Sequence, residues 1–459
     1  MTASIKNGPV ENKMGIMPVV SLIFNMSLPI MLSMFVMALY NIVDSIFVAK
    51  ISENALTAVS LAFPIQNLLI SFAVGTGIGV NSLLSMRLGQ KNQEDVNKTA
   101  MMGIFLSFCT FLLFLILGFT CVDLYLSSQT KNEEILLYAK QYLFVITSFC
   151  FPACAEIMLE RLLQATGRTF FSMISQLIGA ISNIILDPLL IFGIGPFPKM
   201  GITGAAVATV LGQLAGMIVA LVLNLKYNKD IHFKLKNLIP DFKIIGLIYK
   251  VGIPSIAMSS ITSVIAYFVN LILGKFSTTA IAVYGVYIKM NSFVFMPVFG
   301  LTNGIVPIIA YNFGAKHHKR IVDTIKYSVF IATSIMLVGF AVFEIFPKQL
   351  FKMFSAGDEM LAIGIPAFRI IAPSFLGAAV AITLSSVFQA FGNAVYSLLV
   401  SFGRQFVVLL PVAYLLSLTG NVENVWWSFI IAEFMSVGMS LFFMKKIYTQ
   451  KIKPIPLEK

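Results

Sequence analysis

The chain has 459 residues, of which 58% are apolar and only 11% are charged, and its mean hydropathy is +0.90. Soluble globular domains carry about 25% charged residues, so this composition excludes a soluble globular protein. The net charge of +12 does not require a nucleic-acid partner, because basic residues in so apolar a chain are expected in cytoplasmic loops.

Apolar runs bounded by charged residues, glycine and proline predict twelve membrane-spanning helices, since about 20 apolar residues cross the hydrocarbon core of a bilayer. In chain order the predicted spans are 18–48, 55–80, 97–121, 135–158, 164–193, 201–226, 244–273, 280–310, 322–346, 360–387, 394–417 and 425–447. A proline inside a run predicts a break in that helix, and such prolines are Pro29, Pro64, Pro152, Pro188, Pro254, Pro297, Pro373 and Pro411. The predicted fold class is an all-α integral membrane protein.

Basic residues predict the orientation of the chain in the membrane. With the amino terminus inside the cell, the cytoplasmic segments hold 22 Lys and Arg residues and the outer segments hold seven, with three more inside helices. This asymmetry is typical of a multi-pass protein of the cell (inner or plasma) membrane, and it predicts that both termini are cytoplasmic.

An internal repeat relates the two halves of the sequence at a constant offset of 225 residues. It pairs Ser52 with Ser277 and Gly89 with Gly314, and Pro29, Lys91 and Gln164-Ala165 also have their counterparts. Two six-helix bundles related by a pseudo-twofold axis follow, with a cavity between them that rocking can open to either side. The predicted divisions are a cytoplasmic tail 1–17, an N-lobe 18–226, a linker 227–243, a C-lobe 244–447 and a cytoplasmic tail 448–459.

Acidic residues at membrane depth mark function by default, because they are costly there. The first half has two, Asp44 and Asp187. Two carboxylates in a site of low dielectric constant resist joint ionisation, so a nearby pair is expected to hold a proton or a sodium ion. In the alternative interpretation, Asp187 bonds to a broken helix and Asp44 faces the outer loop.

The predicted helix around Asp187 has small or polar residues at steps of three and four, which places them on one face. Asn183 on this face and the hydroxyl of Thr209 on the next helix are expected to add neutral oxygen ligands. The complete face is Ser172, Gln176, Gly179, Asn183 and Asp187.

The second half differs, because Val269 and Val412 stand where the offset would place the two aspartates. We therefore expect ion coupling in the first lobe. For Arg404 and Glu433 we favour a buried structural ion pair. Lys289, with Asn291 on the same helix, lines the cavity or serves as a local counter-charge.

No motif for catalysis is present. The chain has no GxxxxGK[ST] phosphate-binding loop, no HExxH motif and no Cys/His set for a metal. We expect no enzyme activity, no cofactor, and no metal beyond a possible sodium ion.

Several segments together resemble the multidrug and toxic compound extrusion (MATE) transporters, in particular the bacterial DinF/MepA-like branch. The resemblance covers nearly the whole chain. It rests on Ser27-Leu28-Pro29 followed by Asp44, Arg87-Leu88-Gly89, Gln164-Ala165-Thr166-Gly167, Asn183-xxx-Asp187-Pro188, Gly204-Ala205-Ala206-Val207-Ala208-Thr209, and Val306-Pro307-xxx-Tyr311-Asn312-Phe313-Gly314.

The resemblance implies a V-shaped pair of six-helix bundles that exports organic cations in exchange for H⁺ or Na⁺ and gives resistance to antibiotics and other xenobiotics. It assigns the cation site to Asp44, Asn183, Asp187 and Thr209. It also makes Glu160 a candidate for the response to drugs, although a surface pair with Arg161 is an equal alternative. The substrate-cleft candidates are Glu160, Gln176, Lys289 and Asn291.

Two other functions compete with efflux. A lipid-linked saccharide flippase would share the topology and would use cationic residues such as Lys289, Arg369 and Arg404. A membrane receptor or scaffold would need a large extramembrane domain, but the longest predicted loop is the 226–250 stretch. We therefore predict a monomeric antiporter whose partners are small organic cations and membrane lipids, with no nucleic acid.

Overall fold

The computed structural model describes residues 12–354 and 356–456. Of the predicted N-terminal tail, residues 1–11 lie outside this range. The first half of the chain forms α1 (Lys13–Ile16), α2 (Val19–Ala49), α3 (Glu53–Gly89), α4 (Gln93–Thr120), α5 (Val122–Gln129), α6 (Glu133–Ser148), α7 (Phe151–Ala165), α8 (Thr169–Phe192) and α9 (Gly201–Tyr227).

The linker carries a short 3₁₀ helix, η1 (Leu235–Leu238). The second half forms α10 (Phe242–Leu273), α11 (Thr278–Gly314), α12 (His318–Ile345), α13 (Pro347–Lys352), α14 (Asp358–Ile371), α15 (Ser374–Ala390), α16 (Ala394–Phe402), the π-helical turn η2 (Gly403–Leu409), α17 (Leu410–Ser417), α18 (Val422–Ile447) and the π-helical turn η3 (Tyr448–Ile452).

The all-helical membrane fold is confirmed. Within the described part of the chain, ten helices are long and apolar enough to span a membrane, or twelve if each of two bent pairs counts as one span. These pairs are α6–α7, bent by 48°, and α14–α15, bent by 50°.

The prediction that every internal proline breaks its helix is wrong for five of them. Pro152 and Pro373 do lie at the two bends, and Pro411 follows η2. A proline removes one amide donor, and neighbouring helices in a membrane bundle tolerate the freed carbonyl. The helices therefore run on through Pro29, Pro64, Pro188, Pro254 and Pro297.

The 225-residue offset recurs in the local backbone. The hydroxyls of Ser52 and Ser277 cap α3 and α11, and each accepts a 3.0 Å hydrogen bond from the amide three residues on. Lys91 and Lys316 both have positive φ, at 57° and 62°, directly after these two helices. The two halves thus use the same serine cap at the start of this helix and the same backbone turn after its end.

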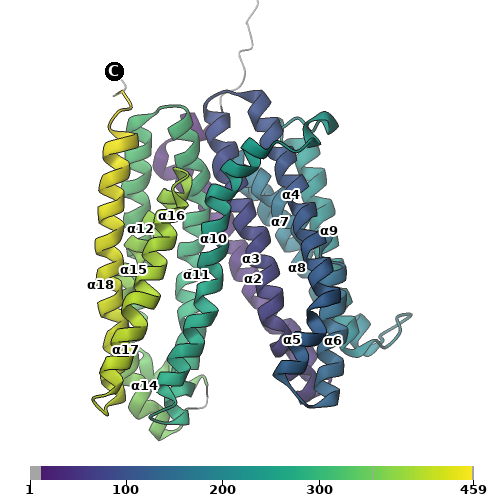
Figure 1. The fold of residues 1–459 in the computed structure, drawn as a ribbon, viewed down its shortest axis with the longest axis vertical. Coiled ribbons are helices and arrows are strands. Elements are labelled where there is room, and N and C mark those ends of the chain that lie inside the picture. Colours follow the sequence, from purple (N-terminus) through teal and green to yellow (C-terminus); the bar gives the residue numbers. More distant parts are fainter. Residues whose placement is uncertain (1–11, 355, 457–459) are drawn as a thin grey trace, which may run out of the picture.

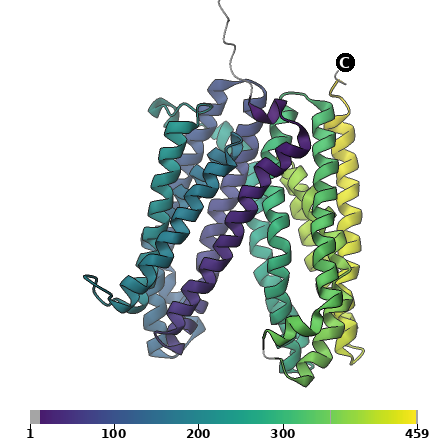
Figure 2. The ribbon, with the colours of Figure 1, turned by 180° about the vertical axis from the view of Figure 1, so that it is seen from behind.

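The helices form two bundles that meet at one end and diverge toward the other (Figures 1 and 2). We call the end that carries the C-terminus the joined end and the opposite end the splayed end. Helix α10 packs against α3 of the first bundle and against α16 of the second, while α2 packs against both α8 and α11. The first long helix of each half therefore contacts both bundles.

Glycines permit the close approach of the bundles at the joined end. A Cβ at Gly89 would overlap the carbonyl oxygen of Tyr311, and one at Gly314 would overlap that of Met86. Met86 and Tyr311 are themselves related by the offset of 225, so the two contacts are reciprocal.

Polar side chains also bridge the bundles. The Ser82 hydroxyl donates to the carbonyl of Gln389 at 2.9 Å. Arg161 donates to the Asn303 side chain at 3.0 Å. These bonds supplement the glycine contacts between the two halves.

Candidate functional site

Two aspartates from different helices meet inside the first bundle. The carboxyl groups of Asp44 on α2 and Asp187 on α8 lie within hydrogen-bonding contact of each other. Asp187 is fully buried, and the Oδ1 atom of each residue is buried without a hydrogen-bond partner among the described residues. The alternative in which Asp44 faces only the outer loop is therefore wrong, and the contact leaves two acceptor atoms for a small cation or a proton.

The amide of Asn183 connects this pair to α9. With its nitrogen toward the carboxyl group, Asn183 donates to Asp187 Oδ2 at 3.1 Å, and its oxygen accepts from the Thr209 backbone amide at 3.1 Å. The opposite orientation leaves only a 3.4 Å bond to the Thr209 hydroxyl. The four residues predicted for the cation site thus lie in one connected cluster.

Two tyrosines complete the surroundings of the cluster. Tyr40 lies near both aspartates, and Tyr142, which is 2% exposed, makes a side-chain hydrogen bond with Thr209. Sequence reasoning did not single them out, because nothing distinguishes them from the other twelve tyrosines. Tyr40 lies four residues before Asp44, but this spacing becomes informative only once α2 is known to face α8. Tyr142 lies on α6, and only the packing of α6 against α9 brings it to Thr209.

A second acidic pair lies on α7. Glu160 is buried and accepts hydrogen bonds from Ser175 at 3.2 Å and from Gln176 at 3.0 Å. The alternative of a surface pair with Arg161 is therefore wrong: Arg161 donates instead to Gln164 and to Asn303 across the bundle interface.

Glu156, one helical turn before Glu160, is a site residue that the sequence analysis missed. It is 9% exposed, and its side chain packs on α8 and α9, where a Cβ at Gly179 would meet its Oε1 at 3.0 Å and one at Gly216 would overlap that atom. No hydrogen bond to Glu156 is formed by another described side chain. The spacing of four residues from Glu160 was the available signal.

The second bundle holds charged residues in a different arrangement. Arg404 and Glu433 form a 3.1 Å ion pair between η2 and α18, as predicted. Lys289 is exposed and lies over the Phe354 ring, and Asn291 Oδ1 is buried without a partner in the described structure. No hydrogen bond between described residues joins Lys289 or Asn291 to the acidic groups of the first bundle, so only two of the four cleft candidates, Glu160 and Gln176, are in contact.

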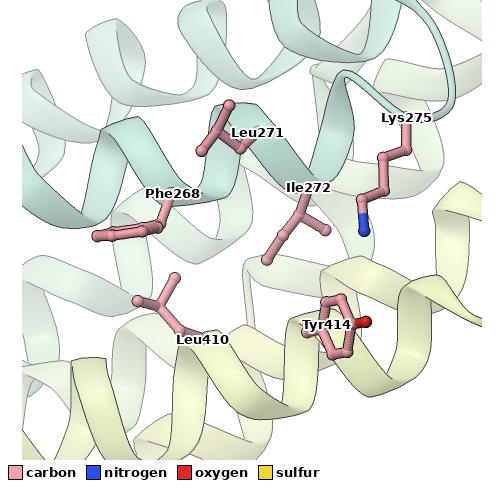
Figure 3. A pocket seen from close by; sticks show the side chains of 6 residues that line it. All are labelled: Phe268, Leu271, Ile272, Lys275, Leu410 and Tyr414. Atoms are coloured by element: carbon pink, nitrogen blue, oxygen red, sulfur yellow. The ribbon is translucent and has the colours of Figure 1, made fainter.

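A small pocket of about 340 Å³ lies between the end of α10 and α17, outside this site. Figure 3 shows Lys275 pointing toward Tyr414, whose ring centroid lies 4.7 Å from the ammonium nitrogen. Its other walls are apolar side chains such as Phe268 and Leu271, which are largely exposed. None of the predicted site residues lines it.

Comparison with known proteins identifies relatives along nearly the whole chain. The family model MatE matches residues 29–189 and again 254–415. The multidrug export protein MepA of Staphylococcus haemolyticus is 28% identical over 421 residues, which are 91% of each chain. A crystal structure of MATE in complex with MaL6 matches with a TM-score of 0.89 at 23% identity and covers 96% of this chain and 99% of that one. An outward-facing multidrug resistance MATE transporter of the MOP superfamily matches with a TM-score of 0.88 at 23% identity, covering 95% and 97%.

Proposed function

The chain belongs to the MATE family of multidrug efflux transporters, and we propose that it exports organic cations in exchange for protons, with Asp44 and Asp187 as the proton-binding pair. Residues 18–226 and 244–447 would be the two lobes that rock against each other. The observation that supports this proposal is the contact between the carboxyl group of the half-buried Asp44 and that of the buried Asp187.

The geometry of the pair supports a proton over a sodium ion. A hydrogen bond between two carboxyl groups requires one proton, which either oxygen can hold. In the orientation that satisfies its own hydrogen bonds, Asn183 directs its nitrogen, a donor, at Asp187 and its oxygen at the Thr209 amide. A sodium ion at this position would need that oxygen as a ligand.

The orientation in the membrane supports uptake of the proton from outside the cell. We propose that the joined end faces the cytoplasm, because it carries the basic linker and the C-terminal lysines. Asp44 lies five residues before the end of α2 at the splayed end. A proton that enters from the splayed side then reaches the aspartate pair before it reaches the cytoplasmic end. Movement of this proton inward along the membrane potential supplies about 2.3 kcal/mol per 100 mV.

The second acidic pair supports a cationic substrate. Glu156 and Glu160 lie in the same bundle as the aspartates. Tyr40 lies within electrostatic range of Asp44, Asp187 and Glu156, so it links the two acidic pairs. A bound organic cation and a proton would then compete for one negatively charged region. Such competition couples the release of the drug to the arrival of the proton.

A flippase is less well supported. It would rely on free cationic residues for a pyrophosphate, and one of the three available, Arg404, is neutralised by Glu433. Inside the first bundle, the four carboxyl groups of Asp44, Glu156, Glu160 and Asp187 would also repel such a substrate.

Reconstituted vesicles test the proposal directly. Asp187→Asn keeps the size of the side chain and removes the shared proton, so it should abolish ethidium export driven by an imposed pH gradient. Asp358→Asn, at an exposed acid on α14, is the matched control and should export at the parental rate. Parental export by Asp187→Asn, or export by the parent under a sodium gradient alone, would contradict the proposed coupling.

A further inference from the structure

A polar pocket of about 960 Å³ lies at the joined end, between the linker and α4. Its walls come from the first turns of α4, from η1 and the residues beside it, and from the start of α10. The pocket holds none of the residues assigned to transport above. Its lysines are Lys98, Lys234, Lys236 and Lys243.

The acidic residues of the pocket are already engaged. Glu94 pairs with Lys98 at 2.7 Å. Asp241 caps α10, where its carboxylate accepts hydrogen bonds from the backbone amides of Lys243 at 2.9 Å and Ile244 at 3.3 Å. The pocket therefore keeps a surplus of positive charge.

The three linker lysines supply this surplus. The ammonium groups of Lys234, Lys236 and Lys243 form no ion pair or hydrogen bond with any other residue that the structure describes, and all three residues are exposed. The four lysines of the pocket outnumber its two carboxylates, Glu94 and Asp241, by two, although Glu94 also attracts Lys236. This surplus of positive charge complements an anion.

The rim of the pocket is apolar and faces outward. Ile239 is 71% exposed and Phe242 is 82% exposed. Phe242 is also the first residue of α10, a helix long and apolar enough to span the membrane. Exposed apolar side chains next to basic ones are typical of segments that lie in the membrane interface. A pocket with such a rim suits the boundary between phosphate head groups and acyl chains.

We infer that this pocket binds the phosphate head group of an anionic phospholipid, with the lysines on the phosphate and with Ile239 and Phe242 against the acyl chains. Because the pocket joins the linker to α4, the bound lipid holds the linker against the first bundle. This site shares no residue with the proposed coupling site, so either proposal can fail its test without affecting the other.

Lipid binding to the full-length protein in detergent tests the site, with phosphatidylglycerol and phosphatidylcholine offered in equal amounts and read out by native mass spectrometry. The parent should retain phosphatidylglycerol in preference. Each lysine near a phosphate is worth about fivefold in affinity, so Lys234→Ala, Lys236→Ala and Lys243→Ala combined should lose about a hundredfold. Because the three side chains are exposed and unpaired, the thermal unfolding of this variant should match the parent.

The matched control removes the same charge from the second bundle at the same end, through Lys319→Ala, Lys326→Ala and Lys445→Ala. This control should keep the preference for phosphatidylglycerol. Equal losses in both triple variants would mean general charge attraction and would overturn the site, as would parental binding by the linker variant.

A further arm separates the lipid from a soluble phosphate compound. Phe242→Ser should weaken the binding of phosphatidylglycerol, since it removes an apolar contact with the chains, and free glycerol phosphate should bind far more weakly than the lipid. If glycerol phosphate binds as tightly as phosphatidylglycerol and Phe242→Ser changes nothing, the occupant is not a lipid and the inference is wrong.

Discussion

Replacing Gly314 by alanine should separate the two bundles at the joined end. The added methyl carbon would lie 3.0 Å from the carbonyl carbon of Met86 and 3.2 Å from the amide nitrogen of Gln90, and it would overlap the Met86 oxygen. Ordinary van der Waals contact begins at 3.4 Å. These neighbours are backbone atoms that cannot rotate away, so α3 and α11 must move apart.

The size of the effect follows from the cost of overpacking. Such a substitution costs about 1–3 kcal/mol in a well-packed region. Only the conformation with the joined end closed bears this cost, so the equilibrium between closed and open should shift by about fivefold to 150-fold. Helix propensity favours alanine over glycine, so it cannot be the cause if the closed conformation is destabilised.

Spin labels at Lys229 and Lys319, in a background without the four native cysteines, report the separation of the bundles at this end. Double electron–electron resonance spectroscopy should show a new population with a longer distance between the two labels for Gly314→Ala. Gly89→Ala should give the same result, because it disturbs the reciprocal contact. Gly285→Ala is the control, because a Cβ there meets nothing within 4 Å. If Gly314→Ala gives the distance distribution of the control, the packing argument fails.

Three other substitutions test separate parts of the structure. Arg404→Leu leaves the buried Glu433 without its partner and should cost about 3–5 kcal/mol of stability, whereas replacing both residues by leucine should restore most of the thermal unfolding temperature; an unchanged temperature in the single variant would mean that the pair is solvated. Glu156→Gln keeps the volume of the side chain and should reduce the export of cationic dyes in vesicles while sparing neutral ones, and an equal loss for both would assign Glu156 a structural role. Ser277→Ala removes the bond to the Ala280 amide and should lower stability by about 1 kcal/mol, a loss that denaturant titration would detect and that glycine at the same position should largely avoid.

Hydrophobicity and the repeat predicted most of the fold. Apolar runs located the spans because a bilayer requires about 20 apolar residues per crossing. They predicted too short a helix for α3, which continues past residue 80 to Gly89. Its last turns carry polar residues and approach the other bundle, so they do not need to be apolar throughout. They also missed α5, whose eight residues lie at the splayed end and need no apolar run.

Proline was an unreliable guide to helix breaks. A break needs a place for the freed carbonyl and for the bend, and only the tertiary structure supplies both. Pro152 and Pro373 begin new helices after sharp bends, whereas α8 continues through Pro188. The sequence contains the same residue in each case.

The candidate site was predictable where charge and periodicity coincide. Asp44 and Asp187 stand out as acids in apolar runs, and Asn183 shares a helix face with Asp187. Glu156 and Tyr142 were not found, because their importance depends on which helices face each other. The ion pair between Arg404 and Glu433 was predictable, because each is a charged residue in an apolar helix and has few other residues of opposite charge to pair with.

The reciprocal glycine contacts have the symmetry of a twofold dimer. Residue 89 approaches 311 while its counterpart 314 approaches 86, so one surface patch packs against its own duplicate, as in an isologous interface between identical subunits. The linker keeps the duplicates at a high effective concentration that two separate chains would lack. Each half is then free to diverge in its interior. The first half holds the two acidic pairs, whereas the buried Glu433 of the second half is paired with Arg404, and the interface between the halves keeps the geometry of a homodimer.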